Sequence, residues 1–319
     1  MIAALLLATL PTLTQLNTGA PALGNGAGVS KFTFFVAGDN RPDQGDGPAG
    51  GFTAVVTEMQ MASPQPVFVL WGGDTIKGKS VTDASKQYPI ARKVFAKLNV
   101  PVFNAPGNHE LNKKGSGDCN DAPDLSGNLL QNYMVFMGLP YGVFTYGNSA
   151  FIAVNTDDSL GNIKPPSGCY NGFVSKSQRE QLEATLAQLR GDPSIQHIFL
   201  FMHRPVRDDN HHQMKPDKKD KGTKYATRVD EFLDTINKLK NPKVAYVFAS
   251  HDHRYFEATP GGSGTTGFII SGGAGAPLSG CPGKPRSGAY YHYVRVDIDG
   301  ANVKATVVPI NGTTPCGAP

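Results

Sequence analysis

The sequence predicts an α/β fold in which a largely parallel, helix-covered β-sheet packs against a second sheet. Strand-like and helix-like segments alternate from residue 31 onwards, and this alternation is typical of parallel sheets covered by helices. Residues 255–308 hold several short β segments and no good helix, which predicts the second sheet. Because no internal repeat and no linker follow residue 30, we expect one domain over residues 31–319.

Short apolar runs rich in β-branched and aromatic residues mark the strands, and apolar residues at helical spacing mark the helices. The expected strands are Phe32–Ala37, Val67–Trp71, Val100–Asn104, Val143–Tyr146, Phe151–Asn155, Ile198–Met202 and Val244–Ala249. The fourth and fifth of these form a hairpin that turns at Gly147-Asn148. The expected helices are Phe52–Met61, Ala84–Leu98, Ser177–Leu189 and Ala226–Leu239.

The first 30 residues contain no charged side chain, and we interpret them as a signal peptide or a disordered N-terminal arm. Their apolar run, Ile2–Leu10, is far shorter than the roughly 20 residues that a membrane span needs. It suits the apolar part of a secretory signal, although the basic residues that usually precede such a segment are missing. We therefore expect a secreted or periplasmic protein without a membrane span. The formal net charge of +4 is mild and does not indicate nucleic acid as a specific partner.

The four cysteines form no CxxC pair, which disfavours a zinc knuckle. Cys119, Cys169, Cys281 and Cys316 all lie in stretches rich in Gly, Pro, Ser or Asp. Such stretches suit surface disulfides in an exported protein. We predict two disulfides, and Cys119–Cys169 with Cys281–Cys316 is the simplest of the three possible pairings.

Polar side chains that can bind metal ions follow five of the expected strands, where ligands gather in open α/β sheets. Carboxylates, an amide oxygen and imidazoles suit a pair of divalent transition metals such as Mn, Fe or Zn. His251 and His253 are two residues apart, so an extended backbone points both to one side. In chain order the motifs are Gly38–Arg41 (GDNR), Gly72–Asp74 (GGD), Gly107–Glu110 (GNHE), His203–Pro205 (HRP) and His251–His253 (HDH).

This motif order resembles that of calcineurin-like metallophosphoesterases, which include purple acid phosphatases. The resemblance runs from Asp39 to His253, about two thirds of the chain, and GNHE with a later HxH is specific only in combination. It implies a four-layer fold of two packed, mixed β-sheets flanked by helices. It also implies two divalent metal ions with Asp74 as the bridging ligand. Asp39 and His253 would complete the first site, and Asn108, His203 and His251 the second.

The resemblance further implies metal-dependent hydrolysis of a small-molecule phosphoric ester. We expect a phosphomonoester, with a phosphodiester as the main alternative, because both use the same metal core. Two metal ions activate a water and clamp the phosphoryl oxygens, while His109 donates a proton to the leaving group. Arg41, Asn108 and His109 are the expected substrate-binding residues, and Arg41 and His109 the expected catalytic ones. Nothing in the sequence indicates the oligomeric state.

Two positions depart from the family pattern. Arg41 stands where the family usually has a metal-binding His, and a guanidinium remains protonated and cannot bind a metal. Lys77 stands where purple acid phosphatases have a Tyr, three residues after the bridging Asp. The first site therefore has only three assignable protein ligands. Either Arg41 binds a phosphate oxygen beside a weaker first metal, which we favour, or the centre holds one metal only.

Two rival functions come from other classes of protein. Gly73–Ser80 (GDTIKGKS) matches the P-loop pattern GxxxxGK[ST] after a strand and before a helix, which suggests a nucleotide-binding ATPase. Against it, Asp74 would point a carboxylate into a cradle for phosphates, and GNHE and HDH would have no role. The second rival is a non-catalytic binding scaffold, suggested by Arg41. Of the other histidines, His211 and His212 could reach the substrate, whereas His197 and His292 are expected to be structural.

Overall fold

The computed structural model describes residues 8–115, 120–158, 171–207, 214, 229–237, 240–261, 264–279, 287–288 and 290–310. A five-stranded sheet has the order β14 (Asn302–Pro309), β13 (His292–Asp299), β1 (Lys31–Ala37), β2 (Val69–Trp71) and β3 (Val102–Asn104). A seven-stranded sheet has the order β12 (Ser287–Gly288), β10 (Tyr255–Thr259), β11 (Gly267–Ser271), β9 (Val244–Ala249), β8 (His197–Met202), β7 (Ser149–Val154) and β6 (Gly142–Tyr146). A small ribbon pairs β4 (Asn112–Lys114) with β5 (Asp121–Pro123).

Both large sheets are mixed. Strands β1, β2 and β3 are parallel to one another, whereas β13 is antiparallel to β1 and β14 is antiparallel to β13. In the other sheet β7, β8, β9 and β11 are parallel, and β6 and β10 are antiparallel to their neighbours. The helices are α1 (Gly50–Met61), α2 (Val81–Phe95), α3 (Asn108–Leu111), α4 (Asn128–Met137), α5 (Lys176–Gly191) and α6 (Val229–Thr235).

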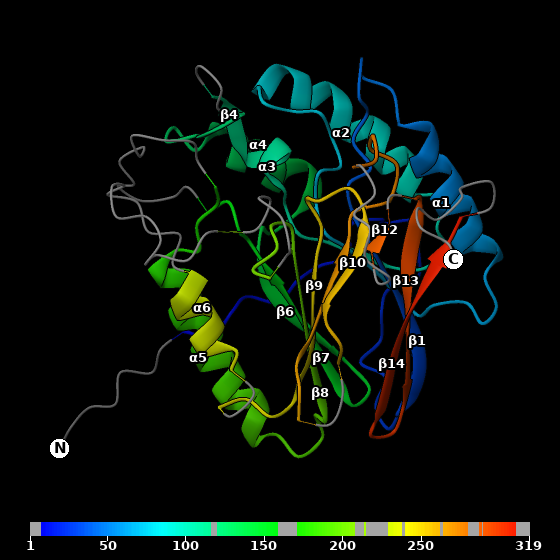
Figure 1. Cartoon of the computed structure of the whole chain (residues 1–319), viewed down its shortest axis with the longest axis vertical. Helices are drawn as coiled ribbons and strands as arrows, with labels where there is room; N and C mark the ends of the chain where they lie inside the picture. The colour runs from blue at the N-terminus through cyan, green and yellow to red at the C-terminus, as the bar shows by residue number, and fades with distance from the viewer. Residues whose placement is uncertain are drawn as a thin grey trace.

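Alternation along the strands produces the four layers. Successive side chains of a strand point to opposite faces, and Phe34 of β1 packs between the sheets, 5.1 Å from the rings of both Phe151 and Phe199. Its neighbour Phe35 packs on the other face with apolar residues of α1 and α2. Helices α5 and α6 cover the outer face of the seven-stranded sheet (Figure 1). The predicted sandwich of two packed sheets flanked by helices is therefore confirmed.

Most predicted elements are present, and a few differ from the structure. The predicted hairpin at Gly147 is present as β6–β7, with Tyr146 opposite Ser149. Within the expected helix 226–239, the structure describes a helix only at α6. The sequence analysis did not predict α4. It also did not predict the β4–β5 ribbon, because three-residue strands are too short for a periodic pattern to appear.

The segment before β1 is part of the fold. The backbone N–H of Leu13 donates to the carbonyl oxygen of Val143 at 3.0 Å, and that of Leu16 donates to Val102 at 2.7 Å. Leu10, Leu13 and Leu16 are all buried, each in a different one of the three apolar layers. The described residues of this segment thus contact the domain, whereas residues 1–7 lie outside the described residues. The interpretation of residues 1–30 as a signal peptide or a disordered arm stays a prediction.

Several expectations fall outside the described residues. All four cysteines do, as do His211 and His212, so the two disulfides stay a prediction. Among the residues that the structure describes, no helix has both the length and the apolar character of a membrane span.

We predict that Leu13→Ala lowers the free energy of unfolding by about 2–5 kcal/mol, because it leaves a cavity between the two sheets. Chemical unfolding followed by circular dichroism measures the change. Val135→Ala on α4 is the control, since Val135 is 75% exposed and its loss should change stability by no more than about 0.5 kcal/mol. Equal stability of wild type and Leu13→Ala would show that the segment does not dock in solution.

Candidate metal centre

The ends of five strands bring the predicted ligands together. Asp39 follows β1, Asp74 follows β2, Asn108 begins α3 after β3, His203 follows β8, and His251 follows β9. Two groups of possible metal ligands result, and within each group the ligand atoms all lie within 4.8 Å of one another. The groups are Asp74 with His203 and His251, and Asp74 with Asp39 and His253.

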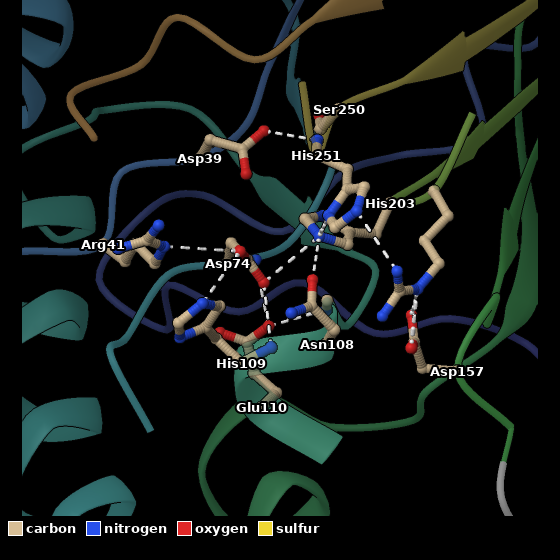
Figure 2. A network of polar contacts seen from close by, with 12 residues as sticks. Asp39, Arg41, Asp74, Asn108, His109, Glu110, Asp157, His203, Ser250 and His251 are labelled. Carbon is tan, nitrogen blue, oxygen red and sulfur yellow. Dashed lines mark hydrogen bonds and ion pairs between the residues drawn. The ribbon is translucent and has the colours of Figure 1, made fainter. Parts of the chain in front are cut away.

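The group of Asp74, His203 and His251 converges on Nε2 of His203 (Figure 2). Nδ1 of His203 lies 2.8 Å from the carbonyl oxygen of Gly72, which can only accept, so Nδ1 carries a proton. Nε2 lies 2.8 Å from Asn108 Oδ1, 3.2 Å from Asp74 Oδ1 and 3.0 Å from His251 Nδ1. Two oxygen acceptors thus face one ring nitrogen, which is favourable only with a cation or a second proton between them. This donor set fits a divalent transition metal.

The other group contains a buried oxygen that lacks a donor. Asp39 Oδ2 accepts the backbone N–H of His251 at 2.6 Å, but Asp39 Oδ1 has no hydrogen-bond partner among the described residues. Nε2 of His253 lies 3.5 Å from that Oδ1. Nδ1 of His253 lies against the carbonyl oxygen of Pro277 and donates to it, so the Nε2 lone pair faces Asp39. A buried carboxylate oxygen without a partner is costly, and a metal ion would satisfy it.

The backbone is strained where the ligands converge. Asp39, Asp74 and His251 have φ angles of 62°, 51° and 72°, which non-glycine residues rarely adopt. Each such residue costs about 1–3 kcal/mol, and such residues cluster at functional sites. Gly107 is required for a steric reason, because an added Cβ there would lie 2.3 Å from Asp74 Oδ1.

Arg41 points into the site. Its Nε lies 3.6 Å from Asp74 Oδ2, and its side chain is 19% exposed. Lys77, at the other departure from the family pattern, also lines the cavity beside Asp74, and its Nζ donates to the carbonyl oxygen of Asp43 at 2.7 Å. Of the two departures, only Arg41 places a cation next to the shared carboxylate.

His109 lies beside Asp74 without joining either ligand group. Its Nδ1 lies 2.5 Å from the carbonyl oxygen of Lys77 and donates to it, and its Nε2 lies 3.9 Å from Asp74 Oδ2. Burial lowers the pKa of His109 to about 4, although the Asp74 carboxylate opposes this shift. The neutral ring therefore carries its proton on Nδ1 and presents the lone pair of Nε2 at the site.

Burial alone raises the pKa of Asp74, but interactions with neighbouring side chains outweigh it and hold this pKa well below its usual value. The strongest of these neighbours is His203, followed by His109 and Arg41. Asp74 is therefore ionised, as a shared metal ligand must be.

Glu110 is a site residue that we did not predict, although it is the last letter of the GNHE motif. Its carboxylate is fully buried and accepts the backbone N–H groups of Asp74, Thr75, Ile76 and Gly107 at 2.6–3.2 Å. Burial, and the nearby Asp74 carboxylate, raise the pKa of Glu110 to about 7. These four donors favour its ionised form.

The contacts of Glu110 also exclude the P-loop interpretation of Gly73–Ser80. In a P-loop, the backbone N–H groups of the loop bind phosphate. Here the N–H groups of residues 74–76 already bind a carboxylate of the protein itself. The P-loop lysine would be Lys79, and its Nζ is paired with Asp121.

Asp121 and Arg204 surround the second group, together with Asp157, and the sequence did not assign them. Asp121 Oδ1 accepts from Asn108 Nδ2 at 3.2 Å, and Asp121 Oδ2 accepts from Arg204 Nη2 at 2.8 Å. Burial raises the pKa of Asp121, but Arg204 and Lys79 outweigh it and lower this pKa to about 2. Arg204 belongs to the HRP motif, but its contacts with Asp121 and Asp157 are long-range, and no local motif predicts them.

A cavity of about 890 Å³ opens onto both ligand groups. Its lining includes Arg41, Asp74, Asn108, His109, His251 and His253. His197 and His292 do not line it, and they bond the carbonyl oxygens of Gly300 and Tyr290 as structural residues would.

Comparisons with known proteins agree with this geometry. Residues 32–255 match the family model of the calcineurin-like phosphoesterases. A purple acid phosphatase from yellow lupin (Lupinus luteus) seeds is similar in structure, with a TM-score of 0.63 and 16% sequence identity. The similarity covers 91% of this chain and 53% of that one, so this chain spans about half the length of the lupin enzyme.

The anchor in the inner membrane complex of Plasmodium is also similar, with a TM-score of 0.54, 14% identity, and coverage of 90% of this chain and 89% of that one. At these identities both structures show the fold alone. None of the curated proteins matches the sequence. The family match extends over more than half of the chain. The chain therefore belongs to the calcineurin-like phosphoesterases.

Proposed function

We propose that the protein hydrolyses phosphomonoesters at a centre of two divalent metal ions. The observation that carries this proposal is the position of Asp74, whose carboxylate belongs to both ligand groups. Such a pair of ions activates a water and clamps the phosphoryl oxygens when bound. Asp39 and His253 would hold one ion with Asp74, and Asn108, His203 and His251 would hold the other.

The protein itself supplies a cation and a proton donor for the substrate. Arg41 is partly exposed in the cavity, and its planar guanidinium can make paired hydrogen bonds to phosphate oxygens. His109 would give a proton from Nε2 to the leaving oxygen. Its Nδ1 stays bonded to the carbonyl oxygen of Lys77, which fixes the ring. The negative charge of a bound phosphate favours the second proton that this role needs.

Two alternative functions share this site. Phosphodiester hydrolysis would use the same ligands, and turnover of matched nitrophenyl mono- and diesters separates the two reactions. A non-catalytic binding role is the second alternative, and one structure with a similar fold is described as the anchor in the inner membrane complex of Plasmodium. The convergence of all six expected ligands favours hydrolysis, since a scaffold has no need of buried, strained metal ligands.

We predict that Asp74→Asn lowers both the metal content and the turnover of nitrophenyl phosphate, the latter by several orders of magnitude. The substitution keeps the shape of the side chain but removes the charge that both ligand groups share. Metal analysis of the purified protein and steady-state kinetics measure the two effects. Asp297→Asn, in an ion pair on β13, should change neither. Full metal content with near-normal turnover in a folded Asp74→Asn protein would refute the role of Asp74.

We predict that Arg41→His raises metal occupancy towards two ions per chain and weakens inhibition by inorganic phosphate. The imidazole supplies the missing ligand, while the loss of the guanidinium removes a phosphate contact. Arg41→Ala should weaken phosphate inhibition without raising metal occupancy, and Lys93→Ala on the exposed face of α2 controls for charge alone. Unchanged stoichiometry and unchanged inhibition in both Arg41 variants would mean that Arg41 serves neither purpose.

We predict that His109→Ala retains metal but slows alkyl phosphates far more than activated aryl phosphates. A phenolate of low pKa leaves without much protonation, whereas an alkoxide needs a proton. The ratio of kcat values for the two substrate types measures the effect. An equal loss for both types would argue against a proton donor at this position.

A further inference from the structure

The side-chain amide of Asn108 has two different ends, and only its oxygen can bind a metal ion. In the structure Oδ1 faces Nε2 of His203 at 2.8 Å, and Nδ2 faces Oδ1 of Asp121 at 3.2 Å. A rotation of the amide by half a turn would exchange the two ends. It would turn the NH₂ group towards the second ligand group and oppose two acceptor oxygens at Asp121. The residue that accepts from Nδ2, Asp121, therefore decides which end of the Asn108 amide faces the second ligand group.

Asp121 is held so that it can act only as an acceptor. Its side chain is 7% exposed and lies between two cations. Nη2 of Arg204 donates to Oδ2 of Asp121 at 2.8 Å, and Nζ of Lys79 donates to Oδ1, the atom that also accepts from Asn108. Both oxygens of the carboxylate are thus fixed by charge-assisted hydrogen bonds.

Arg204 is itself fixed from a second direction. Its Nε lies 2.8 and 3.0 Å from the two oxygens of Asp157, a carboxylate that is fully buried at the end of β7. The chain of contacts from Asp157 through Arg204 and Asp121 to Asn108 therefore starts three residues after β7 and ends at an expected metal ligand.

We propose that Asp121 is a positioning residue, which holds the Asn108 amide with its oxygen towards the second ligand group. Arg204 and Lys79 hold Asp121 in place for this role. The inference rests on the proposed function, because it takes Asn108 as a metal ligand. It extends that function to a residue that contacts the ligand and not the metal, in the way that partners of ligands commonly set their orientation.

The same part of the chain contains a matched control. Asp124 lies three residues from Asp121, is 1% exposed and pairs with Lys113 at 2.7 Å. Its carboxylate accepts the backbone N–H groups of Ser126 and Leu129, next to the start of α4. None of its described contacts involves a candidate ligand, so Asp124 supports the fold of this region without touching the site.

The test measures Co²⁺ affinity by competition with a chelator, together with the visible absorption spectrum of bound Co²⁺. Asp121→Asn can turn either end of its amide towards Asn108, so it no longer selects one orientation. We expect one Co²⁺ site to weaken by about 10- to 100-fold, the usual cost of losing a ligand's partner, and its spectrum to change. Asp124→Asn should lower thermal stability and leave both the affinity and the spectrum of Co²⁺ as in wild type.

A double-mutant cycle tests the orientation itself. In Asn108→Asp both ends of the side chain are oxygens, so orientation no longer matters, and Asp121 then repels the new carboxylate. Adding Asp121→Asn to this variant should leave Co²⁺ affinity unchanged or raise it, which reverses the effect seen in wild type. The double variant keeps the total charge of the pair, so it also serves if Asp121→Asn alone fails to fold.

The outcomes separate this inference from the proposed function. If wild type binds Co²⁺ and Asp121→Asn binds it equally well with the same spectrum, the positioning role is wrong and the metal centre stands. An equal loss in the wild-type and Asn108→Asp backgrounds would also overturn it, because a merely structural role predicts that result. If wild type binds no Co²⁺, the proposed function fails and the positioning role fails with it.

Discussion

Glu110 accepts hydrogen bonds from two loops that are far apart in the sequence, and the geometry of the metal centre depends on this contact. One loop carries Asp74, and the other carries Asn108. Because a single buried carboxylate binds both loops, the shared ligand and the amide ligand keep a fixed separation. The contact lies in a low-dielectric interior, where charge-assisted hydrogen bonds are strong. The left-handed backbone at Asp74 is held in place by the same bonds.

The sequence predicted much of the site because its motifs are local. Each motif follows a strand, and ligands gather at the carboxyl ends of strands in open α/β folds, so the motifs alone indicated that Asp39, Asp74 and His203 lie together. Asp121 could not be found in this way, because its role depends on a contact with Asn108 across a ribbon of two very short strands. The P-loop match failed for a related reason. A pattern of glycines and a lysine does not report what fills the loop, and here Glu110 fills it.

The fold was predicted at the level of its layers and missed where packing overrides local pattern. The alternation of strand-like and helix-like segments sufficed to predict a sheet covered by helices, and the β-rich residues 255–308 predicted the second sheet. The segment before β1 was interpreted as a signal peptide or a disordered arm because it lacks charge and contains only a short apolar run, yet Leu10, Leu13 and Leu16 are buried. Single leucines that enter three separate layers leave no periodic signal in the sequence.

Two arginines flank the centre, and their surroundings give them different properties. Arg204 is almost fully buried and ion-paired with two carboxylates, so its guanidinium has little freedom. Arg41 is partly exposed, and its Nε has no hydrogen-bond partner among the described residues. A guanidinium in that situation loses less on binding an anion, because it gives up fewer existing hydrogen bonds. The ligand group with fewer protein ligands, Asp74 with Asp39 and His253, is thus the one beside Arg41, the arginine that can bind an anion.

The packing of the segment before β1 has a consequence for the order of events during protein synthesis. Leu16 pairs with the strand that contains Val102, and Leu13 pairs with the strand that contains Val143. Chains fold as they are made, N-terminal parts first, but this segment has no docking site until both partner strands have left the ribosome. Its leucines therefore stay accessible during most of the translation of the first half of the domain. Over that interval a chaperone that binds short apolar stretches competes with the fold for this segment.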